Sequence, residues 1–245
     1  MSAYKRPAYK DWQVRTLHPG DFEALETLSR RVYPLDEPWE YAHFKSHYQI
    51  FPEGQFVACD PKDTSKLAGA AFSLMINWDD YETLDNWDDF TDEGFFTNHD
   101  PGGVTLYGAE VMTSPDYRGR GVGSALYAAR RQLAKDLGVR RIRAGARMRG
   151  YSRYADQLAP EEYLMKVVDG EIFDPTLSFQ LKQGFKILSL VPQYLEDDPE
   201  TLGYAALIEW LNPDVATEAH KRAHDAAFER NVAKPLYNTI FLSKK

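Results

Sequence analysis

A glycine-rich stretch behind an apolar strand is the part of the sequence whose chemistry is clearest. From Val111 it reads Val-Met-Thr-Ser-Pro-Asp-Tyr-Arg-Gly-Arg-Gly-Val-Gly-Ser. Its three glycines remove Cβ atoms that would keep an anionic ligand off the backbone. A helix expected from Val122 adds unpaired N–H groups and the positive end of its dipole, and two arginines add mobile charge. The stretch predicts a pyrophosphate-binding turn made of Arg118, Gly119, Arg120, Gly121, Val122, Gly123 and Ser124.

Other phosphate-binding loops fit this stretch less well. A Walker A loop needs Gly-x-x-x-x-Gly-Lys-Ser/Thr, a string that the sequence lacks. The dinucleotide pattern Gly-x-Gly-x-x-Gly/Ala nearly fits from Gly119, but Ser124 takes its last position, and no acidic residue follows at the distance expected for a ribose contact. An NADP-binding turn and an ordinary strand-to-helix turn stay open as alternatives.

The same residues resemble a known family. Arg-Gly-Arg-Gly-Val-Gly, from Arg118 to Gly123, matches the Gln/Arg-x-x-Gly-x-Gly/Ala signature of the GNAT N-acetyltransferases. Leu-Tyr-Gly-Ala-Glu at 106–110 and the stretches at 144–156 and 171–185 are similar to the GNAT domain that is joined to carbon–nitrogen hydrolase (nitrilase-like) domains in some bacterial proteins. The resemblance covers about residues 13–212. The residues after it are too few for a hydrolase domain.

This resemblance implies a fold and a cosubstrate. The expected fold is α+β (mixed α/β), with a central mixed, mostly antiparallel sheet that is splayed at the coenzyme A site and flanked by helices. Acetyl-CoA, the cosubstrate, would lie between the strands ending near Thr113 and near Val191. The end of the first strand would pair with the pantetheine arm through Val111, Met112 and Thr113, and a backbone N–H there would polarise the thioester carbonyl. Direct attack by an amine needs no metal.

Proton transfer needs a base for the amine and an acid for the departing thiolate. The candidates are Glu110, His99, Tyr151 and Tyr154. Glu110 is the first choice as base, because strand carboxylates here face the acceptor in many relatives. His99 stands beside Asp100 and would titrate near neutral pH. Strand alternation places Tyr107 on the face opposite Glu110.

The thiolate acid is harder to assign. Many GNAT enzymes carry a tyrosine five residues before the Phe of a closing Gly-Phe pair, and Gln180 holds that position here. Tyr151 and Tyr154, in a basic loop after a strand, are the substitutes we consider; aromatic packing is the alternative role for each.

Two other groups of reactive residues have simpler explanations. Glu40, His43 and His47 have helical spacing that could hold zinc, but a helix face without metal fits them better, since the His-Glu-x-x-His pattern is absent. Cys59 follows apolar residues of an expected strand, which favours a buried, unreactive thiol, and a single cysteine excludes an internal disulfide.

Composition limits the partners. The formal net charge of −8 over 245 residues argues against a general nucleic-acid binder. Neither a signal peptide nor a membrane-spanning apolar run is found in the sequence, so we expect a cytoplasmic protein. The expected partner is a small-molecule or protein amine; whether the chain forms a homodimer stays open.

The expected organisation is an N-terminal arm (1–12), a GNAT domain (13–212) and a helical C-terminal extension (213–245). The domain contains an acidic insertion at 77–103 with a repeated Asn-Trp-Asp-Asp motif. Hydrophobic periodicity predicts strands near 14–17, 55–60, 66–76, 104–113, 141–146, 185–191 and 203–210, and helices near 22–32, 39–50, 122–137, 160–168 and 174–184.

The function that this sequence favours is acetyl transfer from acetyl-CoA to a primary amine. A sensor of GNAT fold that binds acyl-CoA without turnover is the alternative, motivated by Gln180. Carboxylates beside aromatic rings in the acidic insertion would suit a cationic acceptor, whereas a solvated flap explains them more simply.

Overall fold

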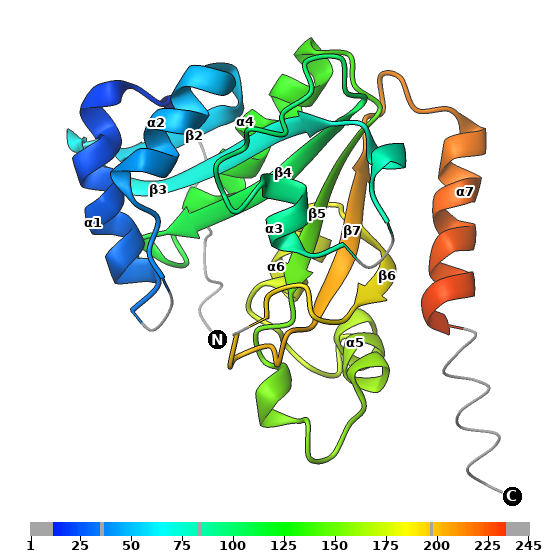
Figure 1. Ribbon diagram of the computed structural model, residues 1–245. Coiled ribbons are helices and arrows are strands. Elements are labelled where there is room, and N and C mark those ends of the chain that lie inside the picture. The colour runs from blue at the N-terminus through cyan, green and yellow to red at the C-terminus, as the bar shows by residue number, and fades with distance from the viewer. Residues whose placement is uncertain (1–11, 35–36, 83–84, 197, 234–245) are drawn as a thin grey trace, which may run out of the picture. The chain divides into compact units, whose positions relative to one another are not determined.

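The computed structural model describes residues 12–34, 37–82, 85–196 and 198–233. The chain forms two compact units, one of residues 1–77 and 91–137, the other of residues 78–90 and 138–245. Figure 1 shows both, with helices around the strands of each. Among the residues described, no helix is both long and apolar enough to cross a bilayer.

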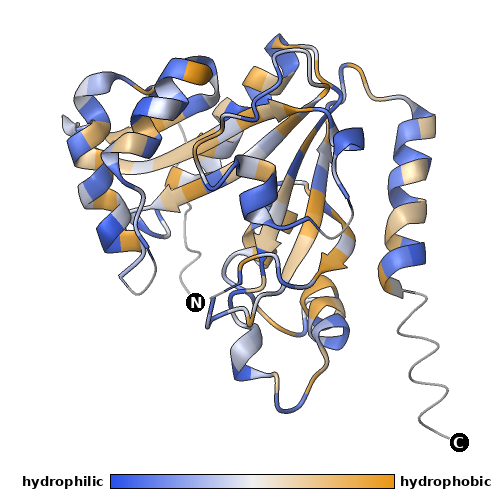
Figure 2. Cartoon of the chain, viewed as in Figure 1, coloured by the Kyte–Doolittle hydropathy of each residue, from blue (hydrophilic) through white to orange (hydrophobic). Residues whose placement is uncertain are grey.

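The first unit is a four-stranded antiparallel sheet with three helices. Its strands, in the order β1-β2-β3-β4, are Gln13–Thr16, Gln55–Asp60, Asp63–Ile76 and Thr105–Thr113. Its helices are α1 (Phe22–Val32), α2 (Tyr41–Ile50) and α4 (Val122–Asp136). Hydrophobic residues concentrate on the strands, and the helices alternate between hydrophobic and hydrophilic positions (Figure 2). That alternation is what a helix covering one face of a sheet requires.

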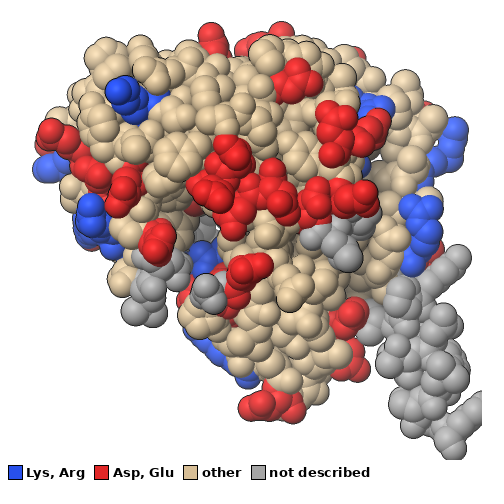
Figure 3. All heavy atoms as spheres, viewed as in Figure 1, with Lys and Arg blue, Asp and Glu red and all other residues tan. Residues whose placement is uncertain are grey.

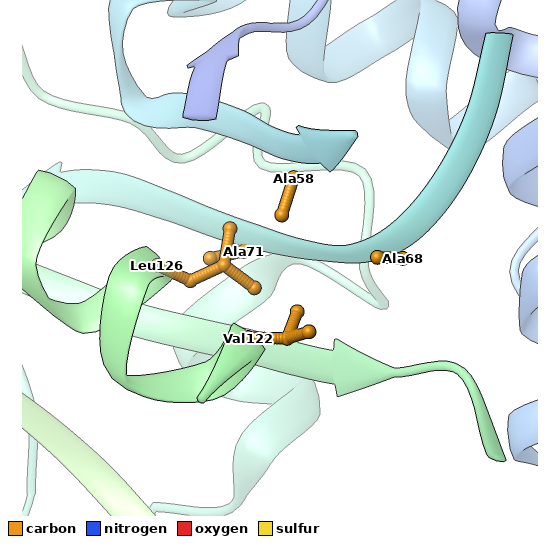
Figure 4. Packing of buried hydrophobic residues seen from close by; sticks show 5 residues of the cluster. All are labelled: Ala58, Ala68, Ala71, Val122 and Leu126. Carbon is orange, nitrogen blue, oxygen red and sulfur yellow. The ribbon is translucent and has the colours of Figure 1, made fainter. Parts of the chain in front are cut away.

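Small side chains bring α4 close to the sheet. Ala58, Ala68 and Ala71 of the sheet region pack with Val122 and Leu126 of α4 in one buried cluster (Figure 4). Gly69 lies at the same contact: a Cβ there would stand 2.6 Å from the carbonyl oxygen of Met112 and 2.8 Å from the side chain of Val122. The glycine-rich start of α4 is therefore held against the strands β3 and β4.

A β-bulge interrupts β4 at its middle. Phe72 of β3 pairs with Glu110, but the next residue, Ser73, pairs with Gly108, so Ala109 is an extra residue on β4. Leu74 then pairs with Tyr107. Because Phe72 and Leu74 share one face of β3, their partners Glu110 and Tyr107 share that face too. The prediction that Tyr107 faces away from Glu110 was wrong, because simple alternation does not hold across a bulge.

The second unit contains a three-stranded antiparallel sheet. Its strands, in the order β5-β7-β6, are Arg141–Arg147, Ala205–Leu211 and Lys186–Val191. Its helices are α5 (Pro160–Val168), α6 (Leu177–Lys182) and α7 (Glu218–Phe228). The strand ending at Val191 is thus an edge strand of this sheet, not the central strand that the resemblance led us to expect.

The helices and strands predicted from the sequence are confirmed, with ends that shift by one to three residues. The acidic insertion, expected as a long loop, also holds a 3-10 turn, Trp78–Asp80, and the short helix α3, Trp87–Thr91. The arm at 1–11 and the apolar patch at 239–242 lie outside the described residues. The proposed boundaries at 12, 212 and 213 stay predictions.

Candidate functional site

The glycine-rich turn (Arg118–Ser124) has the backbone geometry that an anion-binding turn needs. Gly119 and Gly121 adopt positive φ angles of 73° and 89°, which favour glycine. A Cβ on Gly119 would meet no atom within 4 Å, so the space beside this residue is open. Gly121 is the N-cap of α4, and the first helical bond runs from the N–H of Ala125 to its carbonyl, 3.0 Å. The N–H groups of the first turn of α4 therefore point toward the open side of the turn.

Three contacts fix this turn on the first unit. The indole N–H of Trp12 donates to the carbonyl of Arg120, 2.8 Å. The phenol of Tyr117 donates to the carboxylate of Asp60, 2.6 Å. The N–H of Ser114 donates to the carbonyl of Ala68, 2.9 Å. An anion would therefore meet a turn whose shape is already set.

The two arginines of the turn are exposed. Arg120 lies over the ring of Tyr117, with 5.7 Å between its guanidinium carbon and the ring centroid. Arg118 forms no hydrogen bond or ion pair with any residue in the described part of the chain. Its guanidinium is consequently available to an external phosphate oxygen.

The carboxylate of Glu110 lies on the face of β4 that α1 and α2 cover. Its Oε1 accepts a hydrogen bond of 2.7 Å from the phenol of Tyr33, the residue that ends α1. Its Oε2 accepts one of 3.1 Å from the indole N–H of Trp39, just before α2. The side chain is half-buried. These two neutral donors hold the carboxylate in one orientation.

The indole of Trp39 packs against a layer of other rings. Its ring is 5.2 Å from the ring of His47 and 6.1 Å from that of Phe96. His47 is fully buried, stacks on Phe96 at 3.7 Å and hydrogen-bonds the carbonyl of Gly94, 2.6 Å. Burial lowers the pKa of His47 to about 3, so the imidazole is neutral and donates this bond. The aromatic layer fixes the donor that Glu110 needs.

The side chain of His99 forms a hydrogen bond with the backbone. Its Nδ1 accepts the N–H of Met75 at 3.0 Å, and the ring stacks on Phe51 with centroids 4.6 Å apart. Nδ1 is then the unprotonated nitrogen, and the proton is on Nε2. Burial lowers the pKa of His99, against the effect of Asp100. The nitrogen that could act as a base is therefore already an acceptor, and this geometry favours Glu110 over His99 as base.

The two candidate tyrosines differ in burial. Tyr151 is buried and donates from its phenol to the carbonyl of Leu158, 3.2 Å; burial raises its pKa. Tyr154 is half-buried, with its ring 5.4 Å from that of Tyr163. Gln180, the residue in place of the usual tyrosine, is buried in α6. Packing accounts for Tyr151 more readily than for Tyr154.

The alternative metal and thiol sites receive no support from their surroundings. The Nδ1 of His43 accepts the N–H of Glu40, 3.1 Å, and His47 binds the carbonyl described above. In the ranges that the structure covers, no group of three or more His, Cys, Asp or Glu could hold a metal ion. Cys59 is fully buried, and burial raises the pKa of its thiol.

The acidic insertion divides between the two units. Within the second unit, Trp78 and Tyr81 both stack on Phe90, with centroids 5.0 and 4.8 Å apart, and the guanidinium of Arg143 lies 4.2 Å over Trp78. The aromatic rings are thus packing residues. The insertion's carboxylates are mostly exposed, and Figure 3 shows acidic side chains gathered around α3.

Comparison with known proteins identifies the family. The model of the acetyltransferase (GNAT) family matches residues 22–152, more than half of the chain and including the glycine-rich turn. The chain belongs to this family. YkwB of Bacillus subtilis (strain 168), an uncharacterised N-acetyltransferase, is 32% identical over 203 residues, which cover 81% of this chain and 88% of YkwB.

A second relative is longer than this chain. YhcX of Bacillus subtilis (strain 168), a probable hydrolase, is 39% identical over 219 residues, which cover 89% of this chain but only 42% of YhcX. Among solved structures, the GphF GNAT-like decarboxylase in complex with isobutyryl-CoA superposes with a TM-score of 0.67 at 21% identity, covering 82% of this chain and 99% of GphF. That likeness confirms the predicted GNAT fold.

Sequence reasoning proposed Glu110 as a candidate but did not predict its partners. Tyr33 and Trp39 lie 77 and 71 residues away, one just after a predicted helix and the other at the start of the next. The proline-flanked Tyr33-Pro34 and Pro38-Trp39 pairs were a signal of fixed geometry. The fully buried Arg130, which contacts the backbone of Glu110, was also missed because it stands beside another arginine, Arg131, in a helix.

Proposed function

We propose that this GNAT protein transfers the acetyl group of acetyl-CoA to a primary amine, with Glu110 as the base. The glycine-rich turn would hold the pyrophosphate, and Val111, Met112 and Thr113 would pair with the pantetheine arm. Membership of a family that binds acyl-CoA supports the donor, as do the open space at Gly119 and the available Arg118. The acetyl group and the acceptor are parts of the proposal.

The reaction is a direct substitution at the thioester carbon. The amine nitrogen forms a bond to that carbon, the carbonyl oxygen takes the negative charge, and the nitrogen loses one proton to the Glu110 carboxylate. The carbon–sulfur bond then breaks, and the thiolate takes a proton to leave as free coenzyme A. We favour Tyr154 over Tyr151 as the source of that proton, because burial and a hydrogen bond make the Tyr151 phenol a weaker acid.

The observation that carries the proposal is the environment of Glu110. The carboxylate stands one residue before the strand segment assigned to the pantetheine arm, and it is held by Tyr33 and Trp39. A base must keep one orientation and remain ionised before the amine arrives. The hydrogen bonds from Tyr33 and Trp39 favour one orientation.

The test is release of free thiol from acetyl-CoA across a panel of small amines and peptides. Glu110→Gln is expected to lower the maximal rate by about 10²–10⁴ at neutral pH while leaving the affinity for coenzyme A nearly intact. Glu23→Gln, an exposed change on α1, serves as the control. Full activity of Glu110→Gln contradicts the role of Glu110.

The same assay decides the alternative. Tight binding of coenzyme A without turnover on any amine would favour a sensor, the function that Gln180 first suggested. The position of Gln180, buried in α6, is the observation behind this alternative.

The link to carbon–nitrogen hydrolases is also a proposal. It is supported by the match of this chain to 42% of the length of a probable hydrolase. Hydrolysis of an amide releases a free amine. If the chain acts together with a carbon–nitrogen hydrolase, that amine would be a suitable acceptor. Including primary amines together with their parent amides in the panel tests this idea.

A further inference from the structure

Arg130 is the largest side chain that is fully buried in the described residues, and nothing in the proposed reaction yet uses it. It lies on α4, two turns beyond the glycine-rich turn, and is 1% exposed. An arginine remains charged at any ordinary pH, and a buried cation is costly unless its donors are satisfied. The hydrogen-bond partners of the guanidinium therefore indicate the role of this buried charge.

All of the contacts of its guanidinium with the sheet are at the β-bulge. Nε donates to the hydroxyl of Ser73, 2.9 Å. Nη2 donates to the carbonyl of Phe72, 2.9 Å, and to the carbonyl of Glu110, 2.6 Å. Phe72 and Ser73 are the two residues of β3 between which the register with β4 shifts. One planar group thus joins both strands at the point where the ladder is broken.

Glu110 is consequently held from both faces of the sheet. Tyr33 and Trp39 donate hydrogen bonds to its carboxylate on the face covered by α1 and α2. Arg130 donates a hydrogen bond to its backbone carbonyl on the face covered by α4. A bulge aims a side chain by changing the local twist, and the extra residue makes the strand easier to deform. The planar guanidinium of Arg130 donates three hydrogen bonds across the bulge and thereby keeps it in one conformation.

Charge supports the same arrangement. Burial lowers the pKa of Arg130, whereas Tyr127 and the Glu110 carboxylate act in the opposite direction. The guanidinium carbon lies 5.4 Å from the centroid of the Tyr127 ring. Tyr127 and the Glu110 carboxylate therefore favour the charged form of the guanidinium.

We propose that Arg130 is a positioning residue: it fixes the bulge of β4 and thereby aims the Glu110 carboxylate at the acceptor amine. This inference rests on the proposed role of Glu110 as base. It adds a residue that touches neither substrate but sets the geometry of the one that does.

The test uses Arg130→Lys, which keeps the charge but not the planar fork, and Arg130→Met, which keeps much of the volume without the charge. In both variants the maximal rate is expected to fall by about 10- to 100-fold, while the affinity for coenzyme A stays within about threefold. Arg130→Lys is expected to retain more activity than Arg130→Met. Val57→Ala, a buried change in β2 away from the bulge, controls for lost stability.

A second readout needs no activity. The indole N–H of Trp39 reports the position of the Glu110 carboxylate, and the chain has only five tryptophans, so its NMR resonance can be assigned with Trp39→Phe. Arg130→Lys is expected to move this resonance, whereas Val57→Ala is expected to leave it in place. If wild type shows no turnover at all, the proposed function fails, and the resonance alone decides the positioning role.

A folded Arg130→Lys with the wild-type rate and an unmoved Trp39 resonance overturns the inference. Should neither Arg130 variant fold, Ser73→Ala replaces them, because it removes only the acceptor of Nε. A rate about three- to tenfold lower with a moved Trp39 resonance then supports the inference. An unchanged rate and resonance overturn it.

Discussion

The phenol of Tyr33 donates a hydrogen bond of 2.7 Å to the carboxylate of Glu110, although 77 residues separate them in the chain. The bond joins the end of α1 to β4 and fixes one oxygen of the candidate base. A donor that far away in sequence contributes to the reaction only through the fold. The first prediction follows from it.

Tyr33→Phe should lower the maximal rate by about tenfold, because a hydrogen bond to a charged group contributes about 1.5–3 kcal/mol and its loss frees the carboxylate to turn. The Michaelis constant for acetyl-CoA should barely change, since Glu110, which accepts the bond of the Tyr33 phenol, lies outside the glycine-rich turn. Steady-state kinetics with both substrates check this. Tyr41→Phe, an exposed tyrosine on α2, is the control. An unchanged maximal rate would show that the Trp39 bond alone suffices.

Arg118→Ala should weaken coenzyme A binding by about 1–3 kcal/mol, the contribution of one charge-assisted hydrogen bond. Gly121→Glu should abolish binding, since it places an anion at the N-cap of α4 and a side chain at a φ of 89°. Calorimetric titration with coenzyme A measures both, and Arg222→Ala on the exposed side of α7 is the control. Unchanged affinity in a folded Gly121→Glu protein would remove the pyrophosphate from this turn.

His99 should prove to be structural. His99→Asn keeps an acceptor near the N–H of Met75, so both the maximal rate and the stability should stay close to wild type. His99→Leu leaves that N–H without its acceptor and should cost about 1–3 kcal/mol of stability, again with the maximal rate retained. Urea unfolding and kinetics on the same samples separate the two quantities. A loss of rate in a stable His99→Asn protein would instead make His99 the base.

His47 should make the fold sensitive to acid. Its pKa is about 3 when folded and about 6.5 in an unfolded chain, so above pH 6.5 both states are neutral and its contribution is constant. As pH falls from 6.5 toward 3, the unfolded state binds the proton first and stability is lost, by a total on the order of 5 kcal/mol. Urea unfolding between pH 7 and pH 4 should show a shallower pH dependence in His47→Gln than in wild type. His18→Gln, an exposed histidine, should keep the wild-type slope.

The elements and the turn could be predicted from sequence because their causes are local. Pro160 and the acidic first turn predicted α5 to within a residue, and the three glycines predicted the start of α4. The bulge at Ala109 could not be predicted, because alternation assumes an unbroken ladder. The partners of Glu110 are set by how helices cover the sheet, which no local pattern reports. The same holds for Arg130, because nothing in its sequence neighbourhood indicates that it is buried.

The acidic insertion gives the last prediction, on the class of acceptor. The rings of Trp78, Tyr81 and Phe90 pack on one another and the guanidinium of Arg143 lies over Trp78, so these three rings are less suited to cation–π binding of an acceptor. Its mostly exposed carboxylates carry the negative charge that ion pairing with a cationic amine needs. Asp89 is excluded from the test because it accepts the N–H of Asn86, 2.9 Å, at the start of α3.

Changing Asp79, Asp80 and Asp88 together to Asn tests the exposed carboxylates of the insertion and keeps its aromatic residues. If the acceptor is a cationic amine that binds here, its Michaelis constant should rise by about three- to tenfold at low salt, and the salt dependence of that constant should weaken. The constant for acetyl-CoA should not change. The matched control replaces three exposed carboxylates in and near α7 by their amides: Asp214→Asn, Glu218→Gln and Glu229→Gln. Equal effects of the two variants would mean that net charge alone attracts the acceptor. No effect of either would leave the insertion as a solvated flap anchored by its tryptophans.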